Sequence, residues 1–565
     1  MQELIQGDKI MTNDVVSTNF IHKIIDEDIE NGLSARIHTR FPPEPNGYPH
    51  IGHLKAIWIN YSTAKKYNGL FNLRFDDTNP SKEGDEFVEA FINDLKWLGI
   101  TPDNICFGSD YFDKCYEFAV KLIKDGKAFV CDLTKEEIDQ YRGTLKTAGK
   151  NSPYRNRSVE ENLDLFERMK NGEFADGTKT LRAKIDMSSP NMNMRDPVIY
   201  RILRAHHHRT GDKWCIYPLY DYAHPIQDAL EGITHSLCDV EFENHRPLYE
   251  WVINNIGFEC PPKQREFAKL NITHTKIGKR YSKALIDNGI ADGWDDPRLP
   301  TLRALRRRGY SPEALFNFVQ LSGISKAMSL CDYGLLEHCM REELNLSAGR
   351  RMAVLDPIEV EITNFDEDKV VYFDVANNPA SQEDAGTRKV AFTKHLYIER
   401  EDFSDNPPPK YQRMTLDKEV RFMSAYVVKC NEVLYNEDGS VKKLLCTVDH
   451  ETAGCNPPDG RKIKGTIHWV SKEYAIDAEV RLYENLFTCE DTVVINMDNY
   501  KDYVNPDSVK IMKNAKLEKC LEEASCGDKF QFVRNGYFCC DVHDKNVYNR
   551  IVTLKDSFAK MQKKD

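Results

Sequence analysis

The side chains best suited to catalysis or ligand binding are two histidines. They lie where a predicted strand ends and a predicted helix begins. His50 and His53 follow the Pro/Gly-rich segment 40–49. A helix that begins there would direct its free backbone amides and positive dipole end at a phosphate group. At positions i and i+3, both imidazoles would share one helix face and could donate hydrogen bonds to phosphate oxygens. Gly47 and Gly52 would permit close backbone approach. We therefore predict a nucleotide site; the alternative is an ordinary helix start with two surface histidines.

Other polar clusters allow more than one interpretation. Asp76 and Asp77 follow the apolar run 70–75 and could form a metal site or cap a helix, and the following Thr-Asn-Pro favours a cap for Asp77. The run 206–208 consists of three histidines, and imidazole is a common metal ligand. Consecutive residues of a helix point in different directions, however, so we predict no metal site there.

The elements that must position these groups alternate between strands and helices. A strand before residue 41, a helix from residue 50, a strand at 70–75 and helical apolar spacing at 87–98 favour a parallel sheet. Ligands of such sheets bind at the carboxyl ends of the strands. The irregular stretch 112–219 predicts an inserted domain.

The rest of the chain changes from helical to β texture. Residues 300–350 look helical, whereas 358–362 alternate between apolar residues and glutamates, as in a half-buried strand. Asp438-Gly439 lies between two strand-like runs and predicts a hairpin. A succession of such short strands predicts β-barrels in the last third.

Composition limits the class of protein. A chain of 565 residues should contain several domains, and its 41% hydrophobic content without a long apolar run or signal peptide predicts a soluble cytoplasmic protein. The 16 cysteines form no CxxC pair and are expected to be reduced thiols. A net charge of −12 argues against coating nucleic acid by bulk electrostatics but permits a local basic surface.

Several long segments together resemble one known family. The histidine segment is similar to the HIGH signature of class I aminoacyl-tRNA synthetases, in the branch specific for glutamine and glutamate. The likeness covers about residues 33–560. The segments that carry it are 40–53, 73–80, 223–242, 293–298 and 465–470.

The resemblance implies a multidomain fold. Its parts are an α/β Rossmann-type catalytic domain, an inserted α+β acceptor-stem domain, a helical connector and C-terminal all-β anticodon-binding barrels. The expected ranges are 33–111 and 220–270 for the two halves of the catalytic domain, 112–219 for the insert, 271–348 for the connector with the second signature loop, 349–405 and 488–565 for the proximal barrel, and 406–487 for the distal barrel.

The resemblance also implies a reaction. The amino-acid carboxylate attacks the α-phosphate of ATP, and the resulting adenylate gives its acyl group to a terminal ribose hydroxyl of the tRNA. Alignment and charge stabilisation should dominate the first step, because the carboxylate is already ionised. We expect His50, His53 and Lys279 to supply that stabilisation, with Mg²⁺ held largely by the ATP phosphates and water. The expected ATP-binding residues are Glu44, Asn46, Gly47, His50, Gly52, His53, Lys269, Leu270, Ile277, Gly278 and Lys279.

The second class I signature departs from the family pattern. It falls on 277–280, where Lys279 is retained but Gly278 replaces a serine. We expect the loss of a hydroxyl and a loosened loop.

The resemblance assigns the amino-acid site to five positions. Asp76 is expected to hold the substrate ammonium and Tyr220 to read the substrate through its hydroxyl, with Arg40 and Gln264 near the substrate side chain. Cys238 stands where glutamyl enzymes tend to carry an arginine, which would suit a carboxylate better than an amide. Cys238 therefore favours glutamine.

The expected tRNA contacts lie in both halves of the chain. Asn244 departs from an aspartate that glutaminyl enzymes usually place against the acceptor stem, so discrimination between acceptor stems is expected to differ. Single-stranded anticodon loops are usually read by cations and stacking side chains. The expected tRNA-binding residues are Asn244, Arg350, Arg413, Gln531, Arg534 and Arg550.

The favoured function is ligation of glutamine to its tRNA by a monomer that waits for tRNA before it activates the amino acid. Its expected partners are the glutamine tRNA, glutamine and ATP, with no membrane. A glutamyl-tRNA synthetase of the β-barrel type is the nearest alternative. A catalytically silent, synthetase-like tRNA-binding protein is the other, prompted by Gly278.

Overall fold

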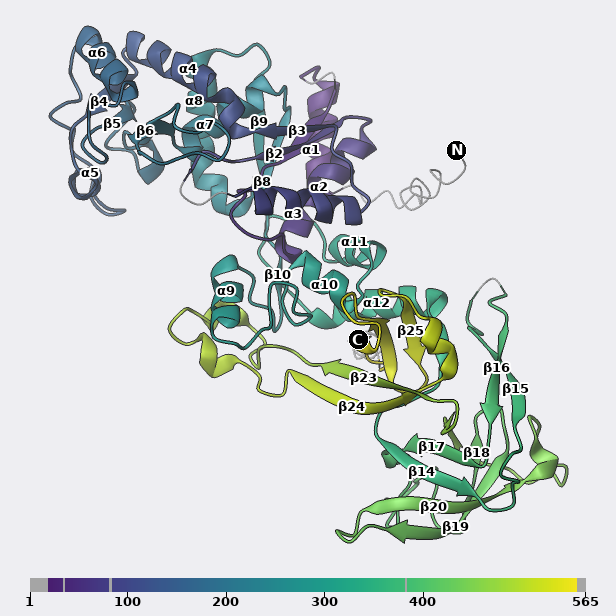
Figure 1. Cartoon of the computed structure of the whole chain (residues 1–565). Coiled ribbons are helices and arrows are strands. Elements are labelled where there is room, and N and C mark those ends of the chain that lie inside the picture. Colours follow the sequence, from purple (N-terminus) through teal and green to yellow (C-terminus); the bar gives the residue numbers. More distant parts are fainter. Residues whose placement is uncertain (1–18, 34–35, 81–83, 382–383, 556–565) are drawn as a thin grey trace. The chain divides into compact units, whose positions relative to one another are not determined.

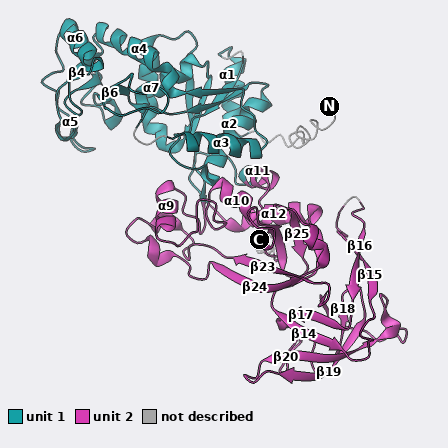
Figure 2. Cartoon of the chain, in the orientation of Figure 1, with its two compact units in different colours: residues 1–271, 319–330 teal, residues 272–318, 331–565 magenta. Residues whose placement is uncertain are grey.

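The chain forms two compact units, each with hydrophobic cores of its own. A computed structural model describes residues 19–33, 36–80, 84–381 and 384–555 (Figure 1). Unit 1 comprises 1–271 and 319–330, and unit 2 comprises 272–318 and 331–565 (Figure 2). The ends of the expected domain ranges at 34–35 and 556–565 lie outside the described residues. Within the described ranges, no helix is long and apolar enough to cross a membrane.

A parallel sheet organises one part of unit 1. Strand β1 (His38–Phe41) pairs in parallel with β2 (Leu70–Phe75), and β2 pairs in parallel with β3 (Asn104–Phe107). Helices α2 (Ile51–Lys66) and α3 (Asp85–Trp97) make the crossovers that parallel strands require. This confirms the predicted strand and helix order.

A second parallel pair lies beside β1. Strands β8 (His235–Asp239) and β9 (Lys263–Phe267) pair with each other, and the Thr234 backbone N donates to the His38 carbonyl at 3.0 Å. Their carboxyl ends therefore lie at the same edge as that of β1. The helical segments around these strands are α1 (Phe20–Glu30), α7 (Tyr220–Leu230), η4 (Val240–His245) and α8 (Arg246–Ile256).

An antiparallel sheet forms from the middle part of the unit 1 sequence and lies at one end of that unit (Figure 1). Its strand order is β4-β5-β6-β7, and its core contains Phe166 and Met169 of α6. The triple histidine 206–208 lies in the connection between β6 and β7, so the assumption that it is helical was wrong. The bounds are β4 (Ala128–Cys131), β5 (Thr180–Ala183), β6 (Val198–Ile202), β7 (Ile216–Pro218), α4 (Phe112–Lys124), α5 (Lys135–Arg142), α6 (Val159–Lys170), η2 (Gly108–Tyr111) and η3 (Met192–Met194).

The predicted helical segment around residues 300–350 is confirmed. Its helices are α10 (Leu302–Arg308), α11 (Pro312–Leu321) and α12 (Tyr333–Ser347), and α9 (Lys279–Asp287) precedes them. The short strands β10 (Asn271–Ile272) and β11 (Leu330–Cys331) coincide with the positions where the chain passes between the units.

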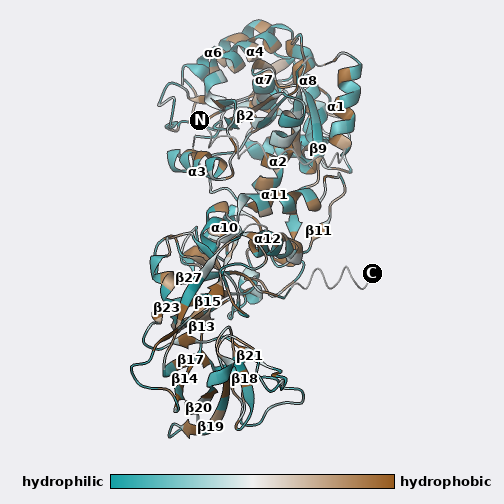
Figure 3. Cartoon of the chain, turned by 90° about the vertical axis from the view of Figure 1, so that its right-hand side faces the viewer, coloured by the Kyte–Doolittle hydropathy of each residue, from teal (hydrophilic) through white to brown (hydrophobic). Residues whose placement is uncertain are grey.

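Besides the two-stranded sheet of β15 and β16, the β-rich part of unit 2 contains two seven-stranded sheets. Their orders are β12-β25-β26-β27-β23-β24-β13 and β21-β18-β19-β20-β14-β17-β22. The predicted hairpin joins β19 to β20, with Gly439 at φ 81°. Hydrophobic residues recur along the strands of the second sheet (Figure 3). Trp469 is buried in the core to which these strands contribute. The bounds are β12 (Gly349–Arg351), β13 (Ala353–Val354), β14 (Pro357–Ile362), β15 (Val371–Ala376), β16 (Thr387–Phe392), β17 (His395–Glu399), β18 (Glu419–Phe422), β19 (Val427–Tyr435), β20 (Val441–Asp449), β21 (Thr466–Ile467), β22 (Val470–Ser471), β23 (Ile476–Tyr483), β24 (Val509–Leu517), β25 (Lys529–Phe532), β26 (Gly536–Cys540) and β27 (Val547–Val552).

The boundary between the two seven-stranded sheets differs from the barrel boundary that the sequence predicted. Strands β14 and β17, expected in the proximal barrel, belong to the sheet of β18–β22, and β23, expected in the distal barrel, belongs to the other sheet. The cause is a parallel pairing of β14 with β20, in which Val360 lies opposite Leu444. Such a long-range pairing leaves no sign in local spacing.

Candidate active site

The loop between β1 and α2 holds the histidine pair in a reciprocal helix cap. His50 is the N-cap of α2, and its Nδ1 accepts from the His53 backbone N at 3.3 Å. The His53 Nδ1 accepts from the His50 backbone N, also at 3.3 Å. The rings stack with centroids 3.7 Å apart and planes 9° from parallel. The predicted helix start is confirmed, and both rings are fixed in direction before any ligand binds.

This geometry determines the protonation of the two rings. Burial lowers the pKa of His50 to about 4 and lowers that of His53 well below its ordinary value. Both imidazoles are therefore neutral at pH 7. Because each Nδ1 accepts a backbone hydrogen bond, each proton lies on Nε2, which is left as the donor for a ligand. The donor role of both histidines toward phosphate stays a prediction, and the histidines of the resting protein do not carry positive charge.

Most of the other predicted ATP-binding residues of unit 1 lie in or beside this loop. The Asn46 backbone N donates to the Glu44 carbonyl at 2.9 Å, and the Asn46 amide contacts the Glu44 carboxylate. Gly47 is buried and Gly52 lies in the first turn of α2. Lys269 and Leu270 follow the carboxyl end of β9, where Lys269 forms an ion pair with Glu241 and Leu270 is buried.

Asp76 lies directly after β2 and is tied to the same loop. Its backbone N donates to the Pro43 carbonyl at 2.9 Å, and its Oδ1 accepts from the Thr78 hydroxyl at 2.8 Å. Burial raises the pKa of the Asp76 carboxyl to about 6, and the nearby Glu44 charge acts in the same direction. A cation beside Asp76 would favour its ionised form.

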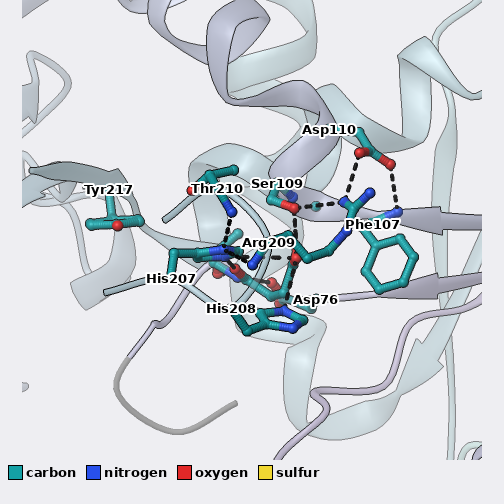
Figure 4. Close-up of polar contacts among 12 residues, drawn as sticks. Asp76, Phe107, Ser109, Asp110, His207, His208, Arg209, Thr210 and Tyr217 are labelled. Carbon is teal, nitrogen blue, oxygen red and sulfur yellow. Dashed lines mark hydrogen bonds and ion pairs between the residues drawn. The ribbon is translucent and has the colours of Figure 1, made fainter. Parts of the chain in front are cut away.

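Asp77 does not cap the following helix. The N-cap of α3 is Gly84, and the Asp77 carboxylate instead accepts from the Ser109 backbone N at 2.7 Å and the Ser109 hydroxyl at 2.6 Å. Within the described residues, Asp77, His207 and His208 are the one group of three that brings possible metal ligands within 4.8 Å (Figure 4). Both His207 nitrogens already make hydrogen bonds to the backbone, which disfavours metal binding.

Arg40 is fully buried in an ion pair that the sequence did not reveal. Its Nε donates to Asp228 Oδ1 at 3.0 Å and its Nη2 donates to Oδ2 at 3.2 Å. Its Nη2 also lies 2.5 Å from the Ser236 hydroxyl. Arg74 donates to the same Asp228 carboxylate at 2.7 Å, and the Tyr249 hydroxyl donates to it at 2.8 Å. Asp228 thus joins β1, β2, α7 and α8.

The charge of Asp228 is stabilised by its partners. Burial alone would raise its pKa, but the charges of Arg40 and Arg74 hold the pKa well below its ordinary value. A permanent carboxylate therefore fixes both guanidinium groups. One sequence signal existed, since Asp228 follows His224 by four residues on a helix and shares its face.

The remaining predicted substrate residues face the same region. The Tyr220 ring stacks on His224 with centroids 4.8 Å apart, and the electrostatic surroundings of Tyr220 include Cys238, Arg40 and Asp76. Burial raises the pKa of the Cys238 thiol, which is therefore neutral at pH 7. The Gln264 amide nitrogen donates to the Phe242 carbonyl at 3.0 Å. The structure thus brings these predicted residues together.

Gly278 adopts a backbone conformation that explains the missing serine. Its φ is +143°, in a region that side chains rarely adopt, and it is the N-cap of α9. An added Cβ would meet the Tyr281 ring at 3.5 Å, an ordinary contact, so conformation and not crowding requires the glycine. Ile277, Gly278 and Lys279 belong to unit 2, whereas the histidine pair belongs to unit 1.

Three of the predicted tRNA arginines of unit 2 already pair with carboxylates. Arg534 donates from both Nη atoms to Asp402 at 2.6 Å, and Arg413 lies 3.2 Å from the same carboxylate. Arg550 instead pairs with Glu484 at 2.5 Å. Only the first two arginines share a partner among these contacts.

Two further predicted tRNA residues lie opposite each other in neighbouring strands, Arg350 in β12 and Gln531 in β25. Gln531 in β25 donates to the Tyr537 hydroxyl at 3.2 Å, and the Arg350 backbone N in β12 donates to the Asn377 carbonyl at 2.6 Å. Asn244 is exposed in η4 of unit 1.

Family models match most of the chain. Residues 36–346 match the catalytic domain of tRNA synthetases class I (E and Q). Residues 348–449 and 466–541 match two anti-codon binding domains of the same family.

Curated relatives match nearly the full length. A glutamine–tRNA ligase of Clostridium kluyveri is 54% identical over 546 residues, covering 96% of this chain and 98% of the relative. One from Chromobacterium violaceum is 51% identical, covering 97% and 99%. A solved glutamate tRNA ligase of Elizabethkingia meningosepticum is 20% identical with a TM-score of 0.41, covering 55% of this chain and 70% of that chain. The catalytic-domain match and the full-length relatives show that this chain belongs to the class I tRNA synthetases of the E and Q family.

Proposed function

We propose that this chain is a glutamine–tRNA ligase that activates glutamine with ATP and transfers the glutaminyl group to a glutamine tRNA. The observation that carries the proposal is the match to glutamine–tRNA ligases over 96% of the chain. The histidine pair and the substrate cluster of unit 1 support it with chemistry suited to adenylate formation.

In the first step, a glutamine carboxylate oxygen bonds to the α-phosphorus of ATP and pyrophosphate leaves. The Nε2–H groups of His50 and His53 donate to phosphate oxygens as negative charge shifts toward the leaving group. Lys279 adds positive charge from the second signature loop. Asp76 holds the substrate ammonium, and because its pKa is about 6, most of it is ionised at pH 7. In the second step, a ribose hydroxyl of the tRNA attacks the acyl carbon and AMP leaves.

The selection of glutamine rests on a neutral surface near the substrate side chain. The thiol of Cys238 and the amide of Gln264 are uncharged, and the Arg40 charge is already compensated by Asp228. A substrate carboxylate would gain no unpaired cation there and would lose its hydration. An uncharged substrate amide loses less hydration free energy than a carboxylate on the same transfer from water. This favours glutamine over the glutamate used by the neighbouring branch.

We assign Mg²⁺ to the phosphates of ATP and not to protein side chains. The group formed by Asp77, His207 and His208 contains two imidazoles, whereas Mg²⁺ prefers oxygen ligands in octahedral geometry. These residues do not fit the ion, so no step is assigned to protein-bound Mg²⁺.

The proposed tRNA path uses both units. The parallel sheet is a Rossmann-type catalytic domain, and the four-stranded sheet inserted in it holds the acceptor stem near Asn244. The β-rich part of unit 2 binds the anticodon, consistent with the two matched anti-codon binding domains. Arg350, Arg413, Gln531, Arg534 and Arg550 are the proposed contacts there.

The test is aminoacylation with matched glutamine and glutamate tRNAs, each supplied with radiolabelled glutamine or glutamate and ATP. We expect transfer of glutamine to the glutamine tRNA alone. A variant with His50→Ala and His53→Ala is the control and should lose the activity. Transfer of glutamate would assign the protein to the glutamyl branch. Absence of any transfer or pyrophosphate exchange would favour a catalytically silent tRNA-binding protein.

A further inference from the structure

The loop between β6 and β7 is fastened to the turn that follows β2. His207 is fully buried, and its Nε2 donates to the Asp77 carbonyl at 2.7 Å. Its Nδ1 accepts from the backbone N of Arg209 at 3.1 Å and of Thr210 at 3.2 Å. The neutral ring is therefore held on both sides and joins two segments far apart in the sequence (Figure 4).

His208 makes a second connection between the same loop and the turn. Its Nε2 lies 3.3 Å from Asp77 Oδ2, and its Nδ1 lies 2.8 Å from Asp85 Oδ1 in the first turn of α3. The carboxylates of Asp77 and Asp85 raise the pKa of His208. In its own loop, His208 is flanked by the neutral ring of His207 and by the guanidinium cation of Arg209. On the side of β3 it faces the uncharged ring of Phe107. The charged form of His208 thus bridges two carboxylates, through a hydrogen bond to Asp85 and an ion pair with Asp77.

Arg209 completes the connection on the side of β3. Its guanidinium lies over the Phe107 ring at 3.9 Å and donates to the Ser109 hydroxyl at 2.9 Å and to Asp110 at 2.7 Å. Ser109 in turn donates to Asp77. Both the backbone and the side chain of Asp77 are consequently fixed by neighbours outside its own strand.

The restraint on Asp77 bears on the adjacent carboxylate. Asp76 shares a peptide bond with Asp77, and its carboxylate is held by Thr78 within the same turn. The direction of the Asp76 carboxylate therefore follows the conformation of the turn. A shift of about 1 Å in a substrate-positioning group is enough to weaken a site strongly.

We propose that His208 is a positioning residue of the amino-acid site, which bridges Asp77 and Asp85 and so holds the Asp76 carboxylate in place for the substrate ammonium. The inference rests on the proposed function, because only a ligase of this kind gives Asp76 an ammonium to hold. The bridge therefore affects the binding of glutamine and not the binding of ATP.

The test is steady-state aminoacylation by the full-length protein, with KM measured separately for glutamine and for ATP. His208→Gln keeps a polar side chain but cannot carry the charge that bridges two carboxylates. We expect its KM for glutamine to rise about tenfold, the size of one charge-assisted hydrogen bond, with kcat and the KM for ATP within about twofold. Asp85→Asn removes the partner that is 81% exposed and should raise the KM for glutamine less. His206→Gln is the matched control, because His206 lies in the same loop with its side chain 71% exposed.

The pH profile separates positioning from mere stability. His208 is charged below its raised pKa, so the bridge is present at low pH and is lost as the pH rises through that value. The KM for glutamine of the wild-type protein should therefore rise on the alkaline side, and His208→Gln should lack this rise.

Three results would count against the inference. An unchanged KM for glutamine in His208→Gln would overturn it. So would equal increases of both KM values together with a lower melting temperature, which indicate a structural role alone. Failure of the wild-type protein to charge any tRNA would instead overturn the proposed function, and this inference with it.

Discussion

Replacement of Asp76 by asparagine tests the central electrostatic contact of the amino-acid site. The Asp76 carboxylate is only 6% exposed, and its pKa is raised to about 6 by burial. The proposed partner is the ammonium of glutamine. Asparagine retains the shape of the side chain and removes its charge, so the substitution isolates the ion pair.

The expected size of the effect follows from burial. Loss of one partner from a buried charge pair costs about 3–5 kcal/mol, because the other charge is left uncompensated. An exposed pair would contribute only about 0–1 kcal/mol. We therefore expect kcat/KM for glutamine to fall by a factor of about 10² to 4 × 10³ in Asp76→Asn at pH 7, since each 1.4 kcal/mol is about a factor of ten.

The pH dependence of kcat/KM for glutamine provides a second test of the role of Asp76. With a pKa of about 6, roughly nine-tenths of Asp76 is ionised at pH 7 and about one-tenth at pH 5. The value of kcat/KM for glutamine should thus fall about tenfold between pH 7 and pH 5 in the wild-type protein. The Glu44 charge contributes to the raised pKa, so Glu44→Gln should move this acid limb to lower pH.

The assay is aminoacylation at saturating ATP and tRNA, with glutamine varied at each pH. Asp76→Asn should show a low and flat profile over the acid range. Persistence of the acid limb in this variant, or a loss of less than about threefold at pH 7, would refute the assignment of Asp76 to the ammonium.

Four further changes test other parts of the site and fold. His53→Ala should lower kcat of pyrophosphate exchange about 10²-fold, since one donor to developing charge is lost, and an unchanged kcat would exclude that role. Gly278→Ala should lower the free energy of unfolding of unit 2 by about 1–2 kcal/mol in urea titrations, because φ is +143°; equal stability would show that the loop relaxes. Asp228→Asn should destabilise unit 1 by about 3–5 kcal/mol near pH 7 and by less as the pH falls through the lowered pKa of Asp228, where the wild-type carboxylate also takes up a proton. Asn244→Asp should change the ratio of kcat/KM for cognate and non-cognate tRNAs, and an unchanged ratio would remove Asn244 from acceptor-stem discrimination.

Local spacing was sufficient for the elements around the histidines. The Pro/Gly segment followed by an apolar helical period predicted a helix from residue 50, one residue before α2 begins, and the run 70–75 predicted β2. The charge state of the two histidine rings could not be predicted from local spacing. It depends on the reciprocal bonds of His50 and His53 and on burial by the rest of unit 1.

Contacts between distant segments account for what the sequence missed. Arg40 and Asp228 are 188 positions apart and no spacing rule connects them. The same holds for the pairing of β14 with β20, which moved the barrel boundary. The triple histidine was judged as helical, whereas it lies in a loop whose conformation is set by Asp77.

The shared carboxylate of Asp402 has a consequence for recognition of RNA. Arg413 and Arg534 are long side chains that would lose about 2 kcal/mol of rotamer freedom each on being ordered at an interface. Here Asp402 has already restrained both during folding. An RNA loop of matching shape would meet a preformed template and lose little further entropy. A loop of another shape would meet guanidinium groups already held by carboxylates, so in the proposed anticodon recognition this rigidity would disfavour such a loop.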